Sequence, residues 1–96
     1  MSAPDLLAEA AAIVAKRRRQ YGPARPLFEQ VAMRWSATLG VEVTPEQVVL
    51  CMIDVKLARL GHDPAHRDSA IDVAGYSSLL ADVAAVSTRP QGKPMK

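Results

Sequence analysis

The four residues Thr44-Pro45-Glu46-Gln47 constrain the fold of this 96-residue chain more than any other feature, because they define the start of a helix. Threonine suits the N-cap, proline the first helical position and glutamine the third, so the segment is a full capping box. Apolar side chains then follow at most positions between residues 48 and 60, on nearly every side of the helix that the segment begins. We expect a helix of that kind to be surrounded by packing partners.

Glycine and proline divide the rest of the chain into three further helical segments. Apolar residues recur at three- and four-residue spacing in each segment, and neither a strand pattern of useful length nor an internal repeat is present. The sequence predicts an all-α domain spanning residues 1–88, with Gly61 at the end of its third helix. The expected helices cover residues 4–20, 26–39, 45–60 and 65–86, and a disordered tail is expected at 89–96.

Composition and charge exclude several classes of protein. Hydrophobic residues make up 49% of the chain and charged residues 23%, so the chain as a whole is not disordered. No apolar run is long enough for a membrane span, no secretion signal is expected, and a single cysteine fits a reducing cytoplasm. Cys51 lies in an apolar run and is expected to be an inert core thiol. The net charge of +2 makes nucleic-acid binding the least favoured function.

A domain of this size buries only part of its apolar surface when it folds alone. For a chain of about this length the buried share is roughly 60–65% of the surface that the unfolded chain exposes. Oligomerisation would bury more, so we expect a homo-oligomer.

Charged side chains interrupt the most apolar of the expected helices. Lys56 and Arg59 are three residues apart and share a face, whereas Asp54 lies about 160° from Lys56 around the helix and cannot pair with it. An unpaired buried charge is costly. The two cations therefore either extend their charged ends to an exposed edge or meet partners from other helices.

Two carboxylates, Asp68 and Asp72, share one face at the start of the last helix, with Tyr76 next in the row. Like charges at this spacing repel one another unless a cation lies between them. That cation is either Mg²⁺, which takes carboxylates together with substrate phosphates, or a basic side chain of the preceding helix, Lys56 or Arg59. Compensation of the helix dipole is a third explanation, and it suits Asp68 better than Asp72.

Three consecutive arginines, residues 17–19, precede Tyr21 at the end of the first helix. They cover most of the helix circumference, so we expect at least one of them to face inward or along an edge. A planar guanidinium suits a phosphate or a carboxylate, and the adjacent tyrosine could stack on a base. The alternative is a basic helix end that is simply solvated.

These features follow one another in a recognisable order: Arg19-x-Tyr21-Gly22, then Phe28 with Ala32 and Trp35, then Lys56-Leu57-Ala58-Arg59, then Asp68-x-x-x-Asp72-x-x-Gly75-Tyr76. From about Arg17 to Leu80 the pattern resembles a family of small uncharacterised bacteriophage proteins. It is similar, more loosely, to phage nucleotide-modification-associated domains and, distantly, to the MazG-like all-α nucleotide pyrophosphohydrolases. The MazG-like resemblance implies a four-helix bundle, usually oligomeric, and Mg²⁺-dependent cleavage of nucleoside triphosphates to monophosphate and pyrophosphate.

The chain departs from the MazG-like pattern at the metal ligands. That pattern holds Mg²⁺ with Glu-x-x-Glu on one helix and Glu-x-x-Asp on the next. This chain offers Asp54 beside two cations, then Asp68 and Asp72 one residue further apart than the pattern, and Glu29 as a fourth carboxylate. A site with fewer acids and added cations is poorer for a metal and better for binding an anion directly.

We therefore expect a phage protein of the host cytoplasm that binds a nucleotide or another phosphorylated small molecule between its helices. Basic residues would meet the phosphates and aromatic residues the base or sugar: Arg18, Arg19, Lys56 and Arg59, with Tyr21, Trp35 and Tyr76. If the protein is an enzyme, Asp54, Asp68 and Asp72, with Glu29, would hold Mg²⁺ that activates water for attack at the α-phosphate. The alternatives are a non-catalytic oligomeric binder that sequesters a nucleotide signal or a host protein, and a structural helical module.

Overall fold

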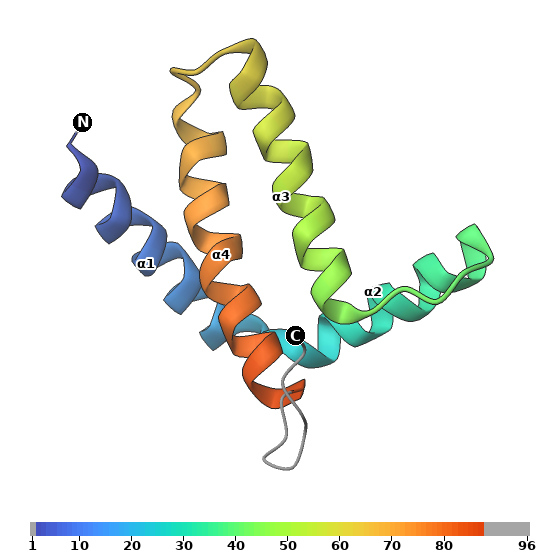
Figure 1. Ribbon diagram of the computed structural model, residues 1–96. Helices are drawn as coiled ribbons and strands as arrows, with labels where there is room; N and C mark the ends of the chain where they lie inside the picture. The colour runs from blue at the N-terminus through green and yellow to red at the C-terminus, as the bar shows by residue number, and fades with distance from the viewer. Residues whose placement is uncertain (1, 88–96) are drawn as a thin grey trace.

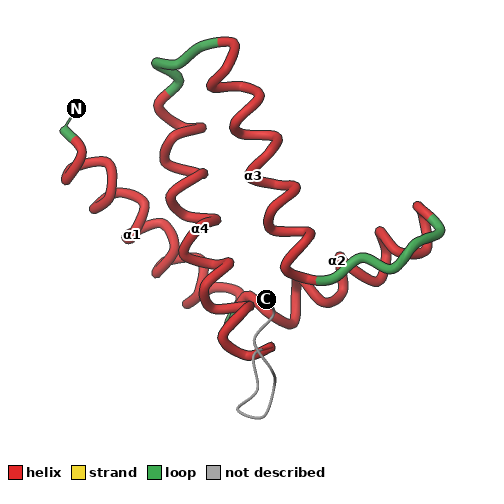
Figure 2. The backbone as a smooth tube through the Cα atoms, in the orientation of Figure 1, coloured by secondary structure: helices red, strands yellow, loops and turns green. Residues whose placement is uncertain are grey.

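Four α-helices make up most of the computed structural model, which describes residues 2–87. They are α1 (Ala3–Tyr21), α2 (Ala24–Leu39), α3 (Pro45–His62) and α4 (Arg67–Ser87) (Figure 1). Helices and short loops account for the whole of residues 2–87, without a strand (Figure 2). The all-α prediction is confirmed, whereas the tail predicted at 89–96 lies outside the described residues. None of the described helices combines the length and the apolar character that a membrane crossing requires.

Helix α4 is the element on which the other three helices pack. Helix α3 lies beside α4 and runs in the opposite direction, and α1 packs along another part of α4. Helix α2 contacts α3 and α4 near its own start and then projects from the body of the molecule, with the loop at residues 40–44 running back along it (Figure 1). The four helices therefore meet at one end of α2 and diverge away from it.

The predicted capping box at the start of α3 is confirmed. Thr44 Oγ1 accepts a hydrogen bond from the Gln47 N–H at 3.1 Å, and Gln47 Oε1 accepts one from the Thr44 N–H at 2.9 Å. The prediction that Gly61 ends this helix is wrong, because its backbone does not enter the positive-φ region that stops α1 and α2 at Gly22 (φ 81°) and Gly40 (φ 74°). The helix continues to His62.

Helix α1 begins within one residue of its predicted start, whereas two other helices begin two residues away from theirs. Helix α2 begins at Ala24, two residues before Pro26, because a proline in the first turn has no helical N–H bond to lose. Helix α4 begins at Arg67, two residues after the predicted start, because the ring of His66 caps it. The His66 Nδ1 accepts a hydrogen bond from the Ser69 N–H at 3.2 Å and lies 2.7 Å from the Ser69 Oγ.

A small apolar core holds the helices together where they meet. Its largest cluster combines Phe28 and Ala32 of α2, Val48 and Val49 of α3 and Val83 of α4. Half-buried side chains pack around this cluster: Ala24, Val31, Trp35, Val43, Ile53, Tyr76, Leu79 and Leu80. Ala10 of α1 and Ile71 of α4 are also buried, so every helix contributes at least one buried apolar side chain.

Helix α3 is not surrounded by partners, contrary to the sequence prediction. Leu50 and Leu57 are 47% and 50% exposed, and Cys51 is exposed as well, so the prediction of a core thiol is wrong. The physical reason is that Cys51 lies two residues after Val49, so its side chain points about 160° away from that of the buried Val49. We define the open face of α3 as the exposed residues on the side of the helix away from the core: Leu50, Cys51, Asp54, Leu57 and Ala58.

Candidate functional site

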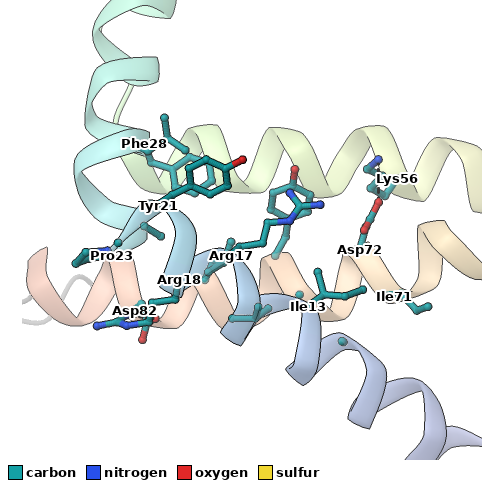
Figure 3. Close-up of a pocket in the computed structure, with 18 residues that line it drawn as sticks. Ile13, Arg17, Arg18, Tyr21, Pro23, Phe28, Lys56, Ile71, Asp72 and Asp82 are labelled. Atoms are coloured by element: carbon teal, nitrogen blue, oxygen red, sulfur yellow. Dashed lines mark ion pairs between the residues drawn. The ribbon is translucent and has the colours of Figure 1, made fainter.

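A cavity of about 610 Å³ lies where the four helices meet (Figure 3). Its lining comes mainly from the second half of α1, the start of α2 and one face of α4, with Lys56 as the contribution of α3. Apolar side chains form most of the wall: Ile13, Val14, Leu27, Phe28, Ile71 and Leu79. The rings of Tyr21 and Tyr76 and a set of charged groups complete it. The volume is in the range typical of small-molecule sites.

The regular spacing of α4 builds one side of this cavity. Gly75 and Tyr76 lie three and four residues after Asp72, and Leu79 and Asp82 follow Tyr76 at three-residue steps, so the five residues share the helix face that lines the cavity. The sequence row that began with Asp68 and Asp72 thus continues to Asp82, which sequence reasoning missed although its spacing could have identified it.

Gly75 lies where α4 approaches α1. A Cβ atom built at this position would lie 3.6 Å from the Val14 Cγ2, which is ordinary van der Waals contact. We therefore expect Gly75→Ala to raise the free energy of unfolding by up to about 1 kcal/mol, since alanine loses less backbone entropy in a helix. Thermal unfolding would then show a melting temperature higher by several degrees, at about 4–8 °C per kcal/mol.

The matched control for this substitution is Gly61→Ala, because a Cβ at Gly61 meets nothing within 4 Å and reports helix propensity alone. If Gly75→Ala lowered stability while Gly61→Ala did not, the contact between α1 and α4 would be tighter than the structure has it.

Lys56 is the most enclosed charged group of the cavity, and its partner comes from the neighbouring helix. The Lys56 Nζ lies 3.0 Å from the Asp72 Oδ2, with the lysine side chain 16% exposed and the aspartate side chain 39% exposed. The sequence left Mg²⁺, Lys56 and Arg59 open as the cation beside Asp72, and in the structure that cation is Lys56. The second pair of the cavity, Arg18 Nη1 to Asp82 Oδ2 at 3.8 Å, is exposed on both sides and contributes little to stability.

Arg17 also lines the cavity, although the sequence had singled out Arg18 and Arg19. Figure 3 shows its side chain extended between Tyr21 and the pair formed by Lys56 and Asp72. The sequence predicted that one or more of the three arginines would face inward or along an edge, and two of them reach the cavity. Arg19 is exposed and is not part of the lining.

Two further residues expected to bind a ligand lie elsewhere. Arg59 belongs to a separate shallow hollow of about 450 Å³, which it shares with Ala58, His62, Asp63 and His66. Trp35 packs against the core cluster and is absent from the cavity lining. The structure therefore separates Arg59 and Trp35 from Lys56, Tyr21 and Tyr76.

The four acids expected to hold Mg²⁺ are not gathered at one place. Asp72 alone lines the cavity, Asp54 belongs to the open face of α3, and Asp68 is exposed in the first turn of α4. Glu29 accepts a hydrogen bond from the Arg25 Nε at 2.9 Å. Within residues 2–87, no three side chains of histidine, cysteine, aspartate or glutamate lie close enough to hold a metal ion together.

Arg25 is a residue that sequence reasoning missed, and it ties three helices together beside the cavity. Its Nη1 donates a hydrogen bond to the Val83 carbonyl oxygen at 2.7 Å and lies 3.7 Å from the Glu46 Oε2. The available signal was its spacing: Arg25 lies three residues before Phe28 on the edge of the apolar stripe, and four before Glu29.

The fold and the cavity define a small all-α protein with a mixed-charge pocket at the junction of its helices. Residues 5–84 match the family described as a domain of unknown function (DUF6378), and the chain belongs to that family. It is 41% identical over 66 residues, 68% of this chain, to the Gene 55 protein of Mycobacterium phage L5. It is 36% identical over 77 residues, 79% of this chain, to the Gene 55 protein of Mycobacterium phage D29.

These comparisons confirm the resemblance to a small bacteriophage protein family. The alignments cover 42% and 51% of the two Gene 55 proteins, so the chain spans about half the length of these curated relatives or less. No solved structure matches the chain.

Proposed function

We propose that this chain binds a nucleotide in the cavity at the junction of its helices. The observation that carries the proposal is the combination, around one apolar cavity, of three basic side chains with two tyrosine rings: Arg17, Arg18, Lys56, Tyr21 and Tyr76. Guanidinium groups suit phosphate geometrically and electrostatically. A tyrosine ring at the rim offers a platform on which a base can stack.

Binding without turnover is the form of this function that the geometry favours. Hydrolysis of the MazG-like kind needs carboxylates grouped around Mg²⁺, which would polarise the phosphates and activate water. In this chain the expected acids are distributed over α2, α3 and α4, and one of them, Asp72, is already paired with Lys56. We therefore limit the proposed distant relation to MazG-like enzymes and to nucleotide-modification-associated domains to the helical scaffold and do not extend it to the hydrolytic reaction.

Isothermal titration with a panel of nucleotides tests this proposal. We expect saturable binding with and without Mg²⁺, weakened about tenfold by Tyr21→Ala, because loss of one base–aromatic stack costs about 1–3 kcal/mol. Tyr21 is 75% exposed, so its removal should leave the fold intact. Arg34→Ala, at an exposed position of α2 outside the cavity, is the control.

A parallel assay for released pyrophosphate distinguishes the two forms of the function. Binding that leaves every nucleotide intact supports the non-catalytic form, whereas Mg²⁺-dependent release of pyrophosphate would show that the protein is an enzyme. Absence of binding to every nucleotide in the panel would reject the proposal.

The open face of α3 supports a second part of the proposal, a homodimer. The face presents Leu50, Leu57, Cys51 and Ala58 around the single charge of Asp54, and no other helix among residues 2–87 covers it. A chain with so few fully buried apolar side chains gains from burying this surface. A standard interface buries about 800 Å² per partner, and in a two-fold dimer one patch meets its own copy.

We expect Leu57→Lys to shift the protein from dimer to monomer in sedimentation-velocity experiments, because it places a charge in the apolar part of the proposed interface. Leu7→Lys, at a 60% exposed position of α1 away from this face, should leave the sedimentation coefficient unchanged. A wild-type protein that sediments as a monomer at every concentration would contradict the dimer.

A further inference from the structure

Most of the charged side chains that line the cavity form ion pairs with one another. Lys56 is paired with Asp72, and Arg18 is paired more loosely with Asp82. Each of these cations is therefore partly neutralised before a ligand arrives. An anion that approaches Lys56 also approaches the carboxylate of Asp72, and the repulsion offsets much of the attraction.

Arg17 is the exception among the basic groups of the cavity. Within residues 2–87 its side chain makes neither an ion pair nor a hydrogen bond. Arg17 is an exposed residue of the cavity lining, and its guanidinium extends between Tyr21 and the pair formed by Lys56 and Asp72 (Figure 3). A guanidinium in this position can donate two parallel N–H bonds to the oxygens of one phosphate.

The other groups that line the cavity compensate further negative charge on a ligand only weakly. Most of the wall is apolar, and the two acids of the cavity, Asp72 and Asp82, repel anions. Charge buried against an apolar wall is costly unless a partner of opposite sign meets it. Arg17, the cation of the cavity without an ion pair among the described residues, can therefore balance one negative charge on a ligand.

We infer that the preferred ligand is a nucleotide with a single, singly charged phosphate, such as the phosphodiester of a 3′,5′-cyclic mononucleotide, and not a triphosphate. The inference rests on the proposed function and adds the charge class of the ligand to it. Arg17 binds the phosphate, and the base lies along the apolar wall beside Tyr21 and Tyr76.

Titration calorimetry on the full chain tests the inference with three adenosine compounds, the 3′,5′-cyclic monophosphate, the 5′-monophosphate and the triphosphate, and with the same three guanosine compounds. For whichever base binds better, we expect the cyclic compound to bind about tenfold or more tightly than the triphosphate in the absence of Mg²⁺. Arg17→Ala should weaken binding of the cyclic compound about tenfold or more, as expected for loss of a hydrogen-bonded charge partner.

Two further variants separate the role of Arg17 from a general effect of charge. Lys16→Ala removes a positive charge from the preceding position of α1, which is exposed and outside the cavity, and should leave affinity unchanged. Asp72→Asn frees Lys56 from its carboxylate partner, so it should increase affinity for the triphosphate about tenfold while changing that for the cyclic compound less.

The outcomes also separate this inference from the proposed function. A triphosphate that binds the wild-type protein as tightly as the cyclic compound, or tighter, would overturn the inference and leave nucleotide binding in place. An unchanged affinity in Arg17→Ala would likewise overturn it. If none of the six compounds binds, the proposed function itself fails.

Discussion

Phe28→Ala is expected to lower the free energy of unfolding by about 3 kcal/mol, the largest effect of a single substitution that we predict for stability. Phe28 is 8% exposed and packs with Val48, Val49 and Val83, so it joins three helices. Removal of its ring loses the free energy gained from burying that apolar surface and leaves a void in the core. We expect the lower end of the range typical for Phe→Ala, because one side of the ring already faces the cavity.

Chemical denaturation at a fixed protein concentration measures this loss, and a fixed concentration matters because a dimer couples stability to association. The total stability of a chain this short is about 5–14 kcal/mol, so the variant would retain only part of it. Met33→Ala is the control, since Met33 lies on the same helix and is 71% exposed. Equal losses in the two variants would mean that Phe28 does not occupy the core position described above.

Arg25→Met is expected to cost about 2 kcal/mol, although it replaces a charged side chain by an apolar one of similar length. The variant loses the hydrogen bond from the guanidinium to the Val83 carbonyl oxygen and leaves Glu46 without this cation. A hydrogen bond that involves a charged group contributes about 1.5–3 kcal/mol. The pair with Glu29 adds little, because the glutamate side chain is 51% exposed.

Arg34→Met is the matched control for this substitution, since it makes the same chemical change at an exposed position of the same helix. Glu29→Gln separates the contributions further and should change the unfolding free energy by only a few tenths of a kcal/mol. If Arg25→Met were no more destabilising than Arg34→Met, the contact between Arg25 and α4 would not contribute to stability.

The helices could be predicted from the sequence because their signals are local. The hydrogen bonds of the capping box at Thr44 and Gln47 close within four residues, and apolar spacing follows from the helical repeat alone. The errors fall where a residue has two local options. Gly61 can end a helix or continue one, and Pro26 can start a helix or lie in its first turn; neighbouring structure decides between them.

The candidate site was less predictable, because it depends on which faces of different helices meet. The sequence offered Lys56 or Arg59 as the cation for Asp68 and Asp72, but which cation meets which acid depends on the register between α3 and α4. Arg59 shares a helix face with Lys56, yet it lies nearly a turn further along α3 and faces a different hollow. The open face of α3 could not be predicted at all, since it results from the direction in which α2 leaves the body of the molecule.

The central position of α4 bears on how this chain folds as it leaves the ribosome. The contacts from Glu9 to Arg67 and from Arg25 to Val83 each span 58 residues, so neither can form while α4 is still inside the exit tunnel. Until the fourth helix emerges, α1 therefore lacks the helix on which it packs, and α2 and α3 have only their contact with each other. Folding force on a stalled nascent chain should accordingly rise in one late step rather than helix by helix.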